Sequence, residues 1–131
     1  MSSNDIGPKG MVRLLSSVSM SETIIHLDIS SHEGIHRNRI GFSGAKMLRH
    51  LLSKNKVLTL LNLKGVSLNI YELEIISKGF EGGNSNLNYL NLCRNEINHG
   101  SNSEAVFNSL ICRSKLTELN LCENYIGQIV R

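Results

Sequence analysis

The sequence predicts an α/β protein in which short parallel strands alternate with helices along a stack of similar repeats. Three segments support this prediction because they align without gaps: LTLLNLKGVSL from Leu58, LNYLNLCRNEI from Leu87 and LTELNLCENYI from Leu116. They start 29 residues apart, and their apolar residues fall at the same positions. A fixed period of this length is the sequence signature of repeat proteins, which bury one continuous core between neighbouring repeats.

Each repeat is expected to begin with a strand, because apolar and polar residues alternate there, and to continue as a helix. IIHLDIS adds an earlier strand through Ile24, Leu27 and Ile29. SNSE, Ser101 to Glu104, has the form of a capping box with Ser101 as the cap. Apolar stripes with helical spacing follow the strands or precede the first one. They are Met11, Leu14, Leu15 and Val18; Ala45, Leu48, Leu51 and Leu52; Leu73, Ile76 and Phe80; and Val106, Phe107, Leu110 and Ile111.

An asparagine recurs where each strand is expected to turn inward. The asparagines at this position are Asn4, Asn38, Asn95 and Asn124. A side-chain amide can donate to and accept from backbone groups at the same time, so we expect these residues to form a structural ladder along the stack. Val66 occupies this position in one repeat, where we expect a locally irregular turn.

LNYLNLCRNEI and LTELNLCENYI, with the 28–29-residue period and the turns NDIGPKG and NRIGFSG, resemble the leucine-rich repeat family. The closest match is to its ribonuclease-inhibitor-like class, and the resemblance covers essentially all 131 residues. It implies a solenoid shaped as a curved horseshoe, with parallel strands on the concave face and helices on the convex face. Family members usually bind another protein on the concave side. This chain departs from the pattern at Val66, at the late Asn38 and at both ends.

The expected organisation is a single domain, 1–131. It comprises a partial repeat 1–23, the repeats 24–57, 58–86 and 87–115, and a partial repeat 116–131. Neither end resembles the polar capping repeat that such stacks need. We therefore expect a piece of a longer array. The alternative is a short protein whose uncapped ends associate end to end with another chain.

HEGIH, His32 to His36, matches the H-E-x-x-H signature of zinc proteases, in which two histidines on one helix face hold the metal. Here the match follows a strand, contains Gly34 and leads into a turn, so no helix is expected. The other histidines do not have the spacing of a third ligand, and His50 lies with an inward-facing apolar stripe. We therefore expect no catalytic zinc, and adventitious metal binding by the histidine pair remains open.

The same segment is an insertion into the repeat. Eight residues separate Ile29 from Asn38, whereas two separate Leu92 from Asn95. Insertions in repeat proteins form loops that often lie on the binding side. We predict that this loop lies at the rim of the concave face and contacts the partner through His32, Glu33, His36, Arg37 and Arg39.

Polar residues between the apolar positions of each strand are expected to form the concave binding face. The predicted partner-binding residues are His26, Asp28, Ser30, Asn62, Lys64, Tyr89, Asn91, Arg94, Glu118, Asn120 and Glu123. Asp28, Asn62, Asn91 and Asn120 occupy one equivalent position and should form a polar row. Tyr89 beside Arg94 is the expected anchor, because Tyr and Arg are enriched at interface hot spots.

Cys93 and Cys122 occupy the same position of neighbouring repeats, so their thiols should be close. We do not expect a structural disulfide there, although adventitious oxidation remains open. Cys112 is predicted to be a small core residue. Three cysteines give no disulfide framework, and no N-x-S/T acceptor is present. Both observations favour a reducing, cytoplasmic location.

Composition argues against several functions. A net charge of +3 and 5% aromatic residues give no basis for nucleic-acid binding, and no apolar run is long enough for a membrane span. Nucleophile, phosphate-loop and paired-carboxylate motifs are absent, so we expect no enzyme, cofactor or metal. The resemblance implies a protein-binding scaffold whose partner is unidentified.

Two alternatives stay open. The first is a GTPase activator of the Ran-activator type, to which Arg37 or Arg39 could contribute. The second is the repeat region of a nucleotide-binding innate-immune-type sensor, which would carry a phosphate-binding loop in a domain upstream.

Overall fold

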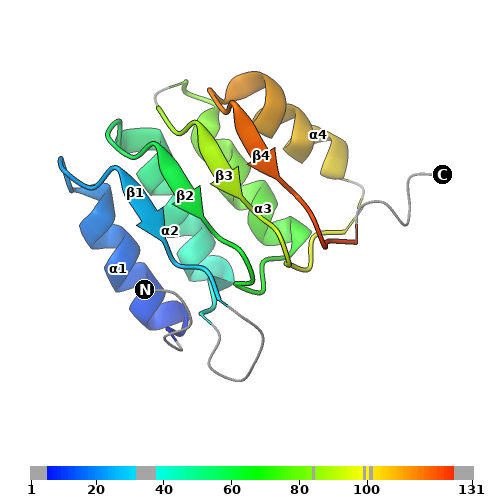
Figure 1. Ribbon diagram of the computed structural model, residues 1–131, viewed down its shortest axis with the longest axis horizontal. Coiled ribbons are helices and arrows are strands. Elements are labelled where there is room, and N and C mark those ends of the chain that lie inside the picture. Colours follow the sequence, from blue (N-terminus) through cyan, green and yellow to red (C-terminus); the bar gives the residue numbers. More distant parts are fainter. Residues whose placement is uncertain (1–5, 32–37, 84, 99, 101, 126–131) are drawn as a thin grey trace.

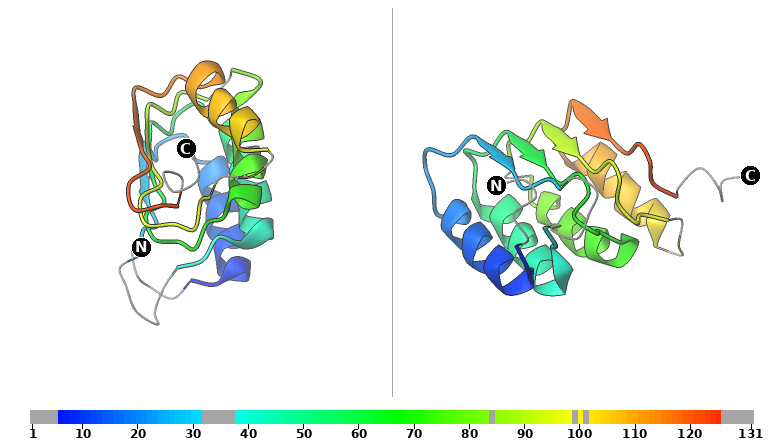
Figure 2. Two further views of the ribbon diagram at one scale, coloured as in Figure 1. Left: turned by 90° about the vertical axis from the view of Figure 1, so that its right-hand side faces the viewer. Right: turned by 60° about the horizontal axis from the view of Figure 1, so that its bottom comes forward.

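The chain folds into two layers, a four-stranded sheet and a row of helices that covers one of its faces (Figures 1 and 2). This computed structural model describes residues 6–31, 38–83, 85–98, 100 and 102–125. The sheet is parallel, and its strands lie side by side in chain order. The α/β prediction with a parallel sheet is therefore confirmed.

Strands and helices alternate as the apolar pattern requires. The strands are β1 (His26–Asp28), β2 (Leu60–Asn62), β3 (Tyr89–Asn91) and β4 (Glu118–Asn120). The helices are α1 (Pro8–Ser19), α2 (Gly41–Lys54), α3 (Ile70–Ser77) and α4 (Ser103–Asn108). A short 3-10 helix, η1 (Lys78–Phe80), extends α3, and a π-helical segment, η2 (Ser109–Arg113), extends α4.

The sheet register aligns the repeats. Leu27, Leu61, Leu90 and Leu119 face one another across the four strands, and their side chains point toward the helices. The first three are buried, whereas Leu119 is only partly buried. The buried core continues through the helix stripes, including Met11, Leu48, Leu73 and Leu110. One apolar layer therefore joins all the repeats.

Local sequence explains where helices begin. Pro8 occupies the first turn of α1, where its missing N–H costs no hydrogen bond. A capping box starts α3: Asn69 Oδ1 accepts from Glu72 N–H, and Glu72 Oε1 accepts from Asn69 N–H. The helix predicted from SNSE begins differently, because Asn102 is the residue before α4 and makes no side-chain cap bond. Ser101 lies outside the described residues.

The predicted core of the helices needs three corrections. Ile111 is 68% exposed, and Cys112 is exposed rather than buried. Both lie in η2, where the change to π-helical spacing rotates side chains away from the stripe that the 3.6-residue period predicts. His50 was expected on the inward stripe of α2 but is exposed, because Leu48, Leu51 and Leu52 fill the inward face.

The turn at Val66 is irregular, as predicted. Gly65 and Ser67 on either side of it both have positive φ (67° and 57°), whereas at the equivalent turn before Asn95 only Arg94 does (56°). Val66 itself is fully buried. Its N–H donates to Asn95 Oδ1 of the next repeat at 3.0 Å, so the turn remains satisfied without an asparagine of its own.

Candidate functional site: the open face of the sheet

The helices cover one face of the sheet and leave the other face open (Figure 2). The strand register places two aligned rows of residues on the open face. His26, Leu60, Tyr89 and Glu118 form the first row. Asp28, Asn62, Asn91 and Asn120 form the second. Because residues alternate between the two faces of a strand, both rows point away from the leucine core.

The second row closes the turns that follow the strands. In each member a side-chain Oδ1 accepts the backbone N–H two residues later, as in Asx turns. The bonds are Ser30 N to Asp28 at 2.9 Å, Lys64 N to Asn62 at 3.1 Å, Cys93 N to Asn91 at 2.9 Å and Cys122 N to Asn120 at 3.0 Å. This row therefore has a structural role whether or not it contacts a partner.

Asp28 is the charged member of that row. Partial burial works to raise its pKa, but hydrogen bonds from Ser30 and Asn62 outweigh burial and hold the pKa below its ordinary value. The carboxylate is therefore charged at neutral pH. Its negative charge lies on the β1 side of the open face.

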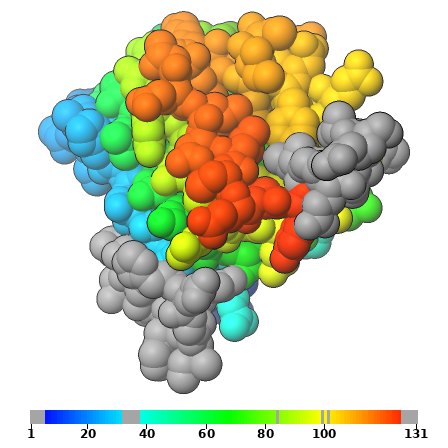
Figure 3. Space-filling view, turned by 45° about the vertical axis from the view of Figure 1, so that its right-hand side comes forward, coloured from blue at the N-terminus to red at the C-terminus, as the bar shows by residue number. Residues whose placement is uncertain are grey.

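Tyr89 and Glu118 bound a shallow hollow on this face. The hollow has a volume of about 270 Å³, and Leu119 and Asn120 complete its lining. Tyr89 is half-buried and Glu118 is exposed. In Figure 3, the segment around β4 (orange to red) lies at the surface. The hollow offers an aromatic ring, a carboxylate and an amide to a ligand.

Arg94 and Glu123 form an ion pair in the turns that follow β3 and β4. Arg94 Nε donates to Glu123 Oε2 at 2.6 Å, and both side chains are well exposed (40% and 58%). An exposed pair of this kind contributes about 0–1 kcal/mol to stability. Its charges therefore remain accessible to a partner.

The structure contradicts the prediction that Cys93 and Cys122 form no disulfide. The two are bonded, with a Cα–Cα distance of 4.6 Å, and they join the segments that leave β3 and β4. Equivalent positions after two adjacent parallel strands bring the sulfurs together. Cysteine pairing therefore no longer supports a reducing compartment.

The predicted partner-binding residues divide by exposure. Six are exposed and available on the open face: His26, Asp28, Arg94, Glu118, Asn120 and Glu123. Asn62, Lys64 and Tyr89 are partly buried. Ser30 and Asn91 are 8% exposed, so the expectation that they form accessible surface was wrong. Asn91 lies on β3, which has a paired strand on each side, whereas the exposed Asn120 lies on β4, which is paired with β3.

Of the five residues predicted to form the rim loop, the structure describes one, Arg39. His32, Glu33, His36 and Arg37, and with them the H-E-x-x-H match, lie outside the described residues. Arg39 is exposed, and its backbone N–H donates to Ile6 O at 2.9 Å.

The asparagines at the inward turns bond backbone groups of two repeats. Asn95 Nδ2 donates to Leu63 O at 2.8 Å and to Leu92 O at 3.0 Å, while Oδ1 accepts from Val66 and Leu68 N–H. Asn38 and Asn124 make bonds of the same kind. Asn38 Oδ1 accepts from Ile6 N–H and Asn124 Oδ1 from Ile97 N–H, and Asn4 lies outside the described residues.

The sequence analysis did not predict a further set of polar residues, which lies at the turns from helix to strand. Asn55 shows its role: Nδ2 donates to Val18 O and Ser21 O, and Oδ1 accepts from Val57 and Leu58 N–H. The set consists of Ser21, Asn55, Ser85 and Ser114. Its signal in the sequence is a Ser or Asn four or five residues before the first residue of each strand.

The outward face of the helices also carries charge that sequence reasoning did not single out. No acidic residue occurs in α1 or α2, which contain Lys9, Arg13, Lys46, Arg49, His50 and Lys54. Lys46, Arg49, His50 and Ser53 line a shallow hollow of about 370 Å³. This face differs from the open sheet face, where both signs of charge are present.

No family model matches the chain, and no curated protein has a similar sequence. Within the described part of the chain, every helix is too short or too polar to cross a lipid bilayer.

Proposed function

We propose that the chain is a leucine-rich-repeat solenoid of the ribonuclease-inhibitor-like class and serves as a non-enzymatic scaffold that binds a partner protein. The 29-residue recurrence of strand, asparagine turn and helix supports the fold. The in-register parallel strands with helices on one side are compatible with it. A horseshoe of this kind presents its strands on the concave side.

The observation that best supports this function is the set of side chains on the open sheet face around Tyr89. Along β3 and β4 the chain offers an aromatic ring in the hollow lined by Tyr89 and Glu118, and the exposed Arg94–Glu123 pair in the turns that follow the same two strands. Tyr and Arg are the residues most enriched at interface hot spots. Because backbone bonds tie the strands to one another, the backbone of the open face needs little ordering on binding, which favours affinity.

A paired substitution tests this proposal. The variant Tyr89→Ala with Arg94→Ala removes the expected anchor, and Tyr71→Ala with Arg49→Ala removes the same residue types from the helix side, where both are exposed. Proteins retained by the wild-type chain are identified by mass spectrometry, and their affinities for the three chains are measured by calorimetry.

The proposal expects the first variant to weaken a genuine partner at least tenfold and the second to leave it unchanged. Equal affinity of all three chains would remove the open face as the binding site. Circular dichroism of each variant controls for loss of fold.

A further inference from the structure

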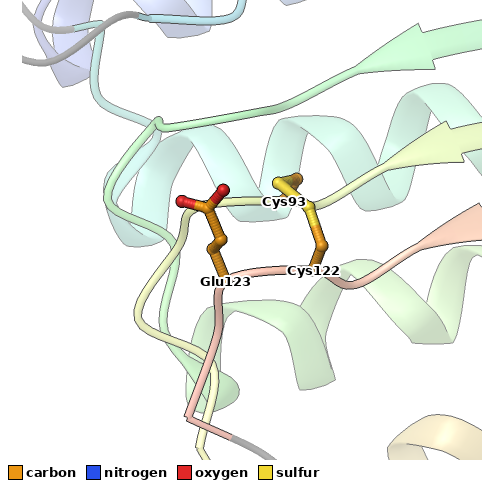
Figure 4. Close-up of side chains that lie close together, drawn as sticks. All are labelled: Cys93, Cys122 and Glu123. Atoms are coloured by element: carbon orange, nitrogen blue, oxygen red, sulfur yellow. A yellow bond between two sulfur atoms is a disulfide. The ribbon is translucent and has the colours of Figure 1, made fainter.

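Three potential metal ligands converge where the chain leaves β3 and β4. The Sγ atoms of Cys93 and Cys122 and a carboxylate oxygen of Glu123 all lie within 4.8 Å of one another. Figure 4 shows the Glu123 carboxylate beside the disulfide, with the three side chains projecting from adjacent loop segments. Neither the proposed scaffold function nor the ion pair with Arg94 requires this convergence of sulfur and oxygen.

Two thiolates and a carboxylate are a donor set that zinc accepts. Zn²⁺ binds Cys at about 2.3 Å and Asp or Glu at about 2.0–2.2 Å, usually with tetrahedral geometry. Soft sulfur ligands discriminate against Mg²⁺ and Ca²⁺, which prefer oxygen alone. Three protein ligands leave the fourth position for water, and Cys122 and Glu123 are exposed, so an ion can enter from solvent.

The backbone holds these ligands in place independently of the S–S bond. Asn91 and Asn120 fix the N–H groups of Cys93 and Cys122, at 2.9 and 3.0 Å. Arg94 N–H donates to Cys122 O at 3.0 Å, which ties the two segments together directly. The thiols therefore stay neighbours when the disulfide opens, and the site needs little rearrangement to close on a metal.

We propose that the reduced chain binds one thiophilic divalent ion of the zinc type through Cys93 Sγ, Cys122 Sγ and Glu123. The same two sulfurs then have two alternative states, a disulfide and a metal-bound dithiolate. This proposal replaces the expectation from sequence that the chain holds no metal.

Conversion of the disulfide state into the metal-bound state takes two steps, reduction and metal binding. A phosphine reductant and one water convert the disulfide into two thiols, with the phosphine oxidised to its oxide. Metal binding then releases the two thiol protons to solvent, because thiolate is the ligand form. Glu123 contributes a carboxylate that is also bonded to Arg94, so the metal competes with the guanidinium for that oxygen donor.

Cobalt(II) provides the test, because thiolate ligation gives a near-ultraviolet charge-transfer band that histidine or carboxylate ligation does not. The full 131-residue chain is reduced with a phosphine under nitrogen, freed of metal and titrated with Co²⁺, and Zn²⁺ is then added. The expected result is one equivalent of cobalt with the thiolate band, followed by bleaching when zinc displaces it.

Matched variants identify the ligands. The third cysteine, Cys112, is exposed in η2, and Cys112→Ser should leave the titration unchanged. Glu123→Gln should weaken cobalt affinity at least tenfold, and Cys93→Ser with Cys122→Ser should abolish the band. The unreduced wild-type chain is a second control that needs no substitution, since it keeps Glu123 but has no thiolate at this site.

The proposal is overturned if reduced wild type gives no thiolate band. It is equally overturned if the band persists in the unreduced chain or in the double serine variant, or disappears with Cys112→Ser. An unchanged affinity in Glu123→Gln would remove Glu123 from the ligand set and contradict the three-ligand site.

Discussion

Strands β3 and β4 carry almost the same sequence pattern but differ in burial. Leu90 and Leu92 in and after β3 are fully buried, whereas Leu119 and Leu121 at the equivalent positions of β4 are only partly buried. The difference comes from neighbours, since β3 is paired on both sides and β4 is paired with β3. The burial of a strand's leucines therefore depends on the neighbouring strands as much as on the strand's own sequence.

The largest expected difference between the two strands concerns their central leucines. Leu90→Ala should lower the free energy of unfolding by about 3 kcal/mol or more, because it leaves a cavity inside a closed core. Leu119→Ala should cost about 1 kcal/mol, because its side chain is already partly exposed. Urea denaturation of the 131-residue chain measures both values. Equal losses would contradict the neighbour argument.

The asparagine turns should show a contrast of the same kind. Asn95→Ala leaves the buried N–H groups of Val66 and Leu68 without an acceptor, at a cost of about 2–4 kcal/mol in total. Asn124→Ala removes the acceptor of one N–H, that of Ile97, at a site where Asn124 itself is only partly buried, and should cost about 1 kcal/mol. Denaturation gives the two values.

Amide hydrogen exchange provides the control for the asparagine variants. In Asn95→Ala, exchange should accelerate most at Val66 and Leu68, which lose their acceptor. Acceleration spread evenly over the chain would mean that Asn95 acts through global stability rather than through this turn.

Much of the fold was accessible from sequence because it rests on periodic apolar positions. Leu61, Leu90 and Leu119 align in the sheet as the 29-residue period requires. The period could not predict features that depend on local helix geometry, and Ile111 and Cys112 became exposed where α4 changes to π-helical spacing. It also placed Cys93 beside Cys122 correctly, although the expectation that the two form no structural disulfide was wrong.

The candidate site was less predictable than the fold. Alternation along a strand says which face a residue points to, but it does not say how much neighbouring loops cover it. Asn91 points to the open face and is nevertheless buried, whereas Asn120 in the same row is exposed. The polar residues at the turns from helix to strand, such as Asn55, were not predicted because they lie outside the alternating pattern of the strands.

Gly65 and Gly83 have nearly the same φ, but Gly65 is buried and Gly83 is exposed. Gly65 and Gly83 have φ of 67° and 68°. A Cβ on Gly65 would lie 2.4 Å from Ser31 O, whereas one on Gly83 has nothing within 4 Å. Gly83→Ala should therefore cost only the left-handed backbone penalty of about 1 kcal/mol, and Gly65→Ala should cost about 2–3 kcal/mol.

Thermal or urea unfolding of both glycine variants measures this difference. Arg94 adopts φ of 56° at the position equivalent to Gly65, so the turn itself tolerates a side chain. Similar losses in the two variants would show that the close approach to Ser31 O relaxes at little cost.

The smallest effects should come from two carboxylates whose pKa values move in opposite directions. Burial raises the pKa of Glu72 above 4.5, nearby Glu96 adds to this, and the hydrogen bond from Asn69 opposes it. The pKa of Asp28 on the open face is instead lowered from 3.8. Glu72 in the interior therefore disfavours its charged form, and Asp28 near the surface favours it.

These directions predict opposite pH dependences. Relative to Glu72→Gln, which keeps an oxygen for the capping box, wild type should lose stability as pH rises from 4.5 through the raised pKa. Relative to Asp28→Asn, wild type should have extra stability above pH 3.8 that disappears as pH falls through the lowered pKa. Urea midpoints between pH 3 and 8 measure both differences. Differences of the same sign would contradict the assignment of a buried and a hydrogen-bonded carboxylate.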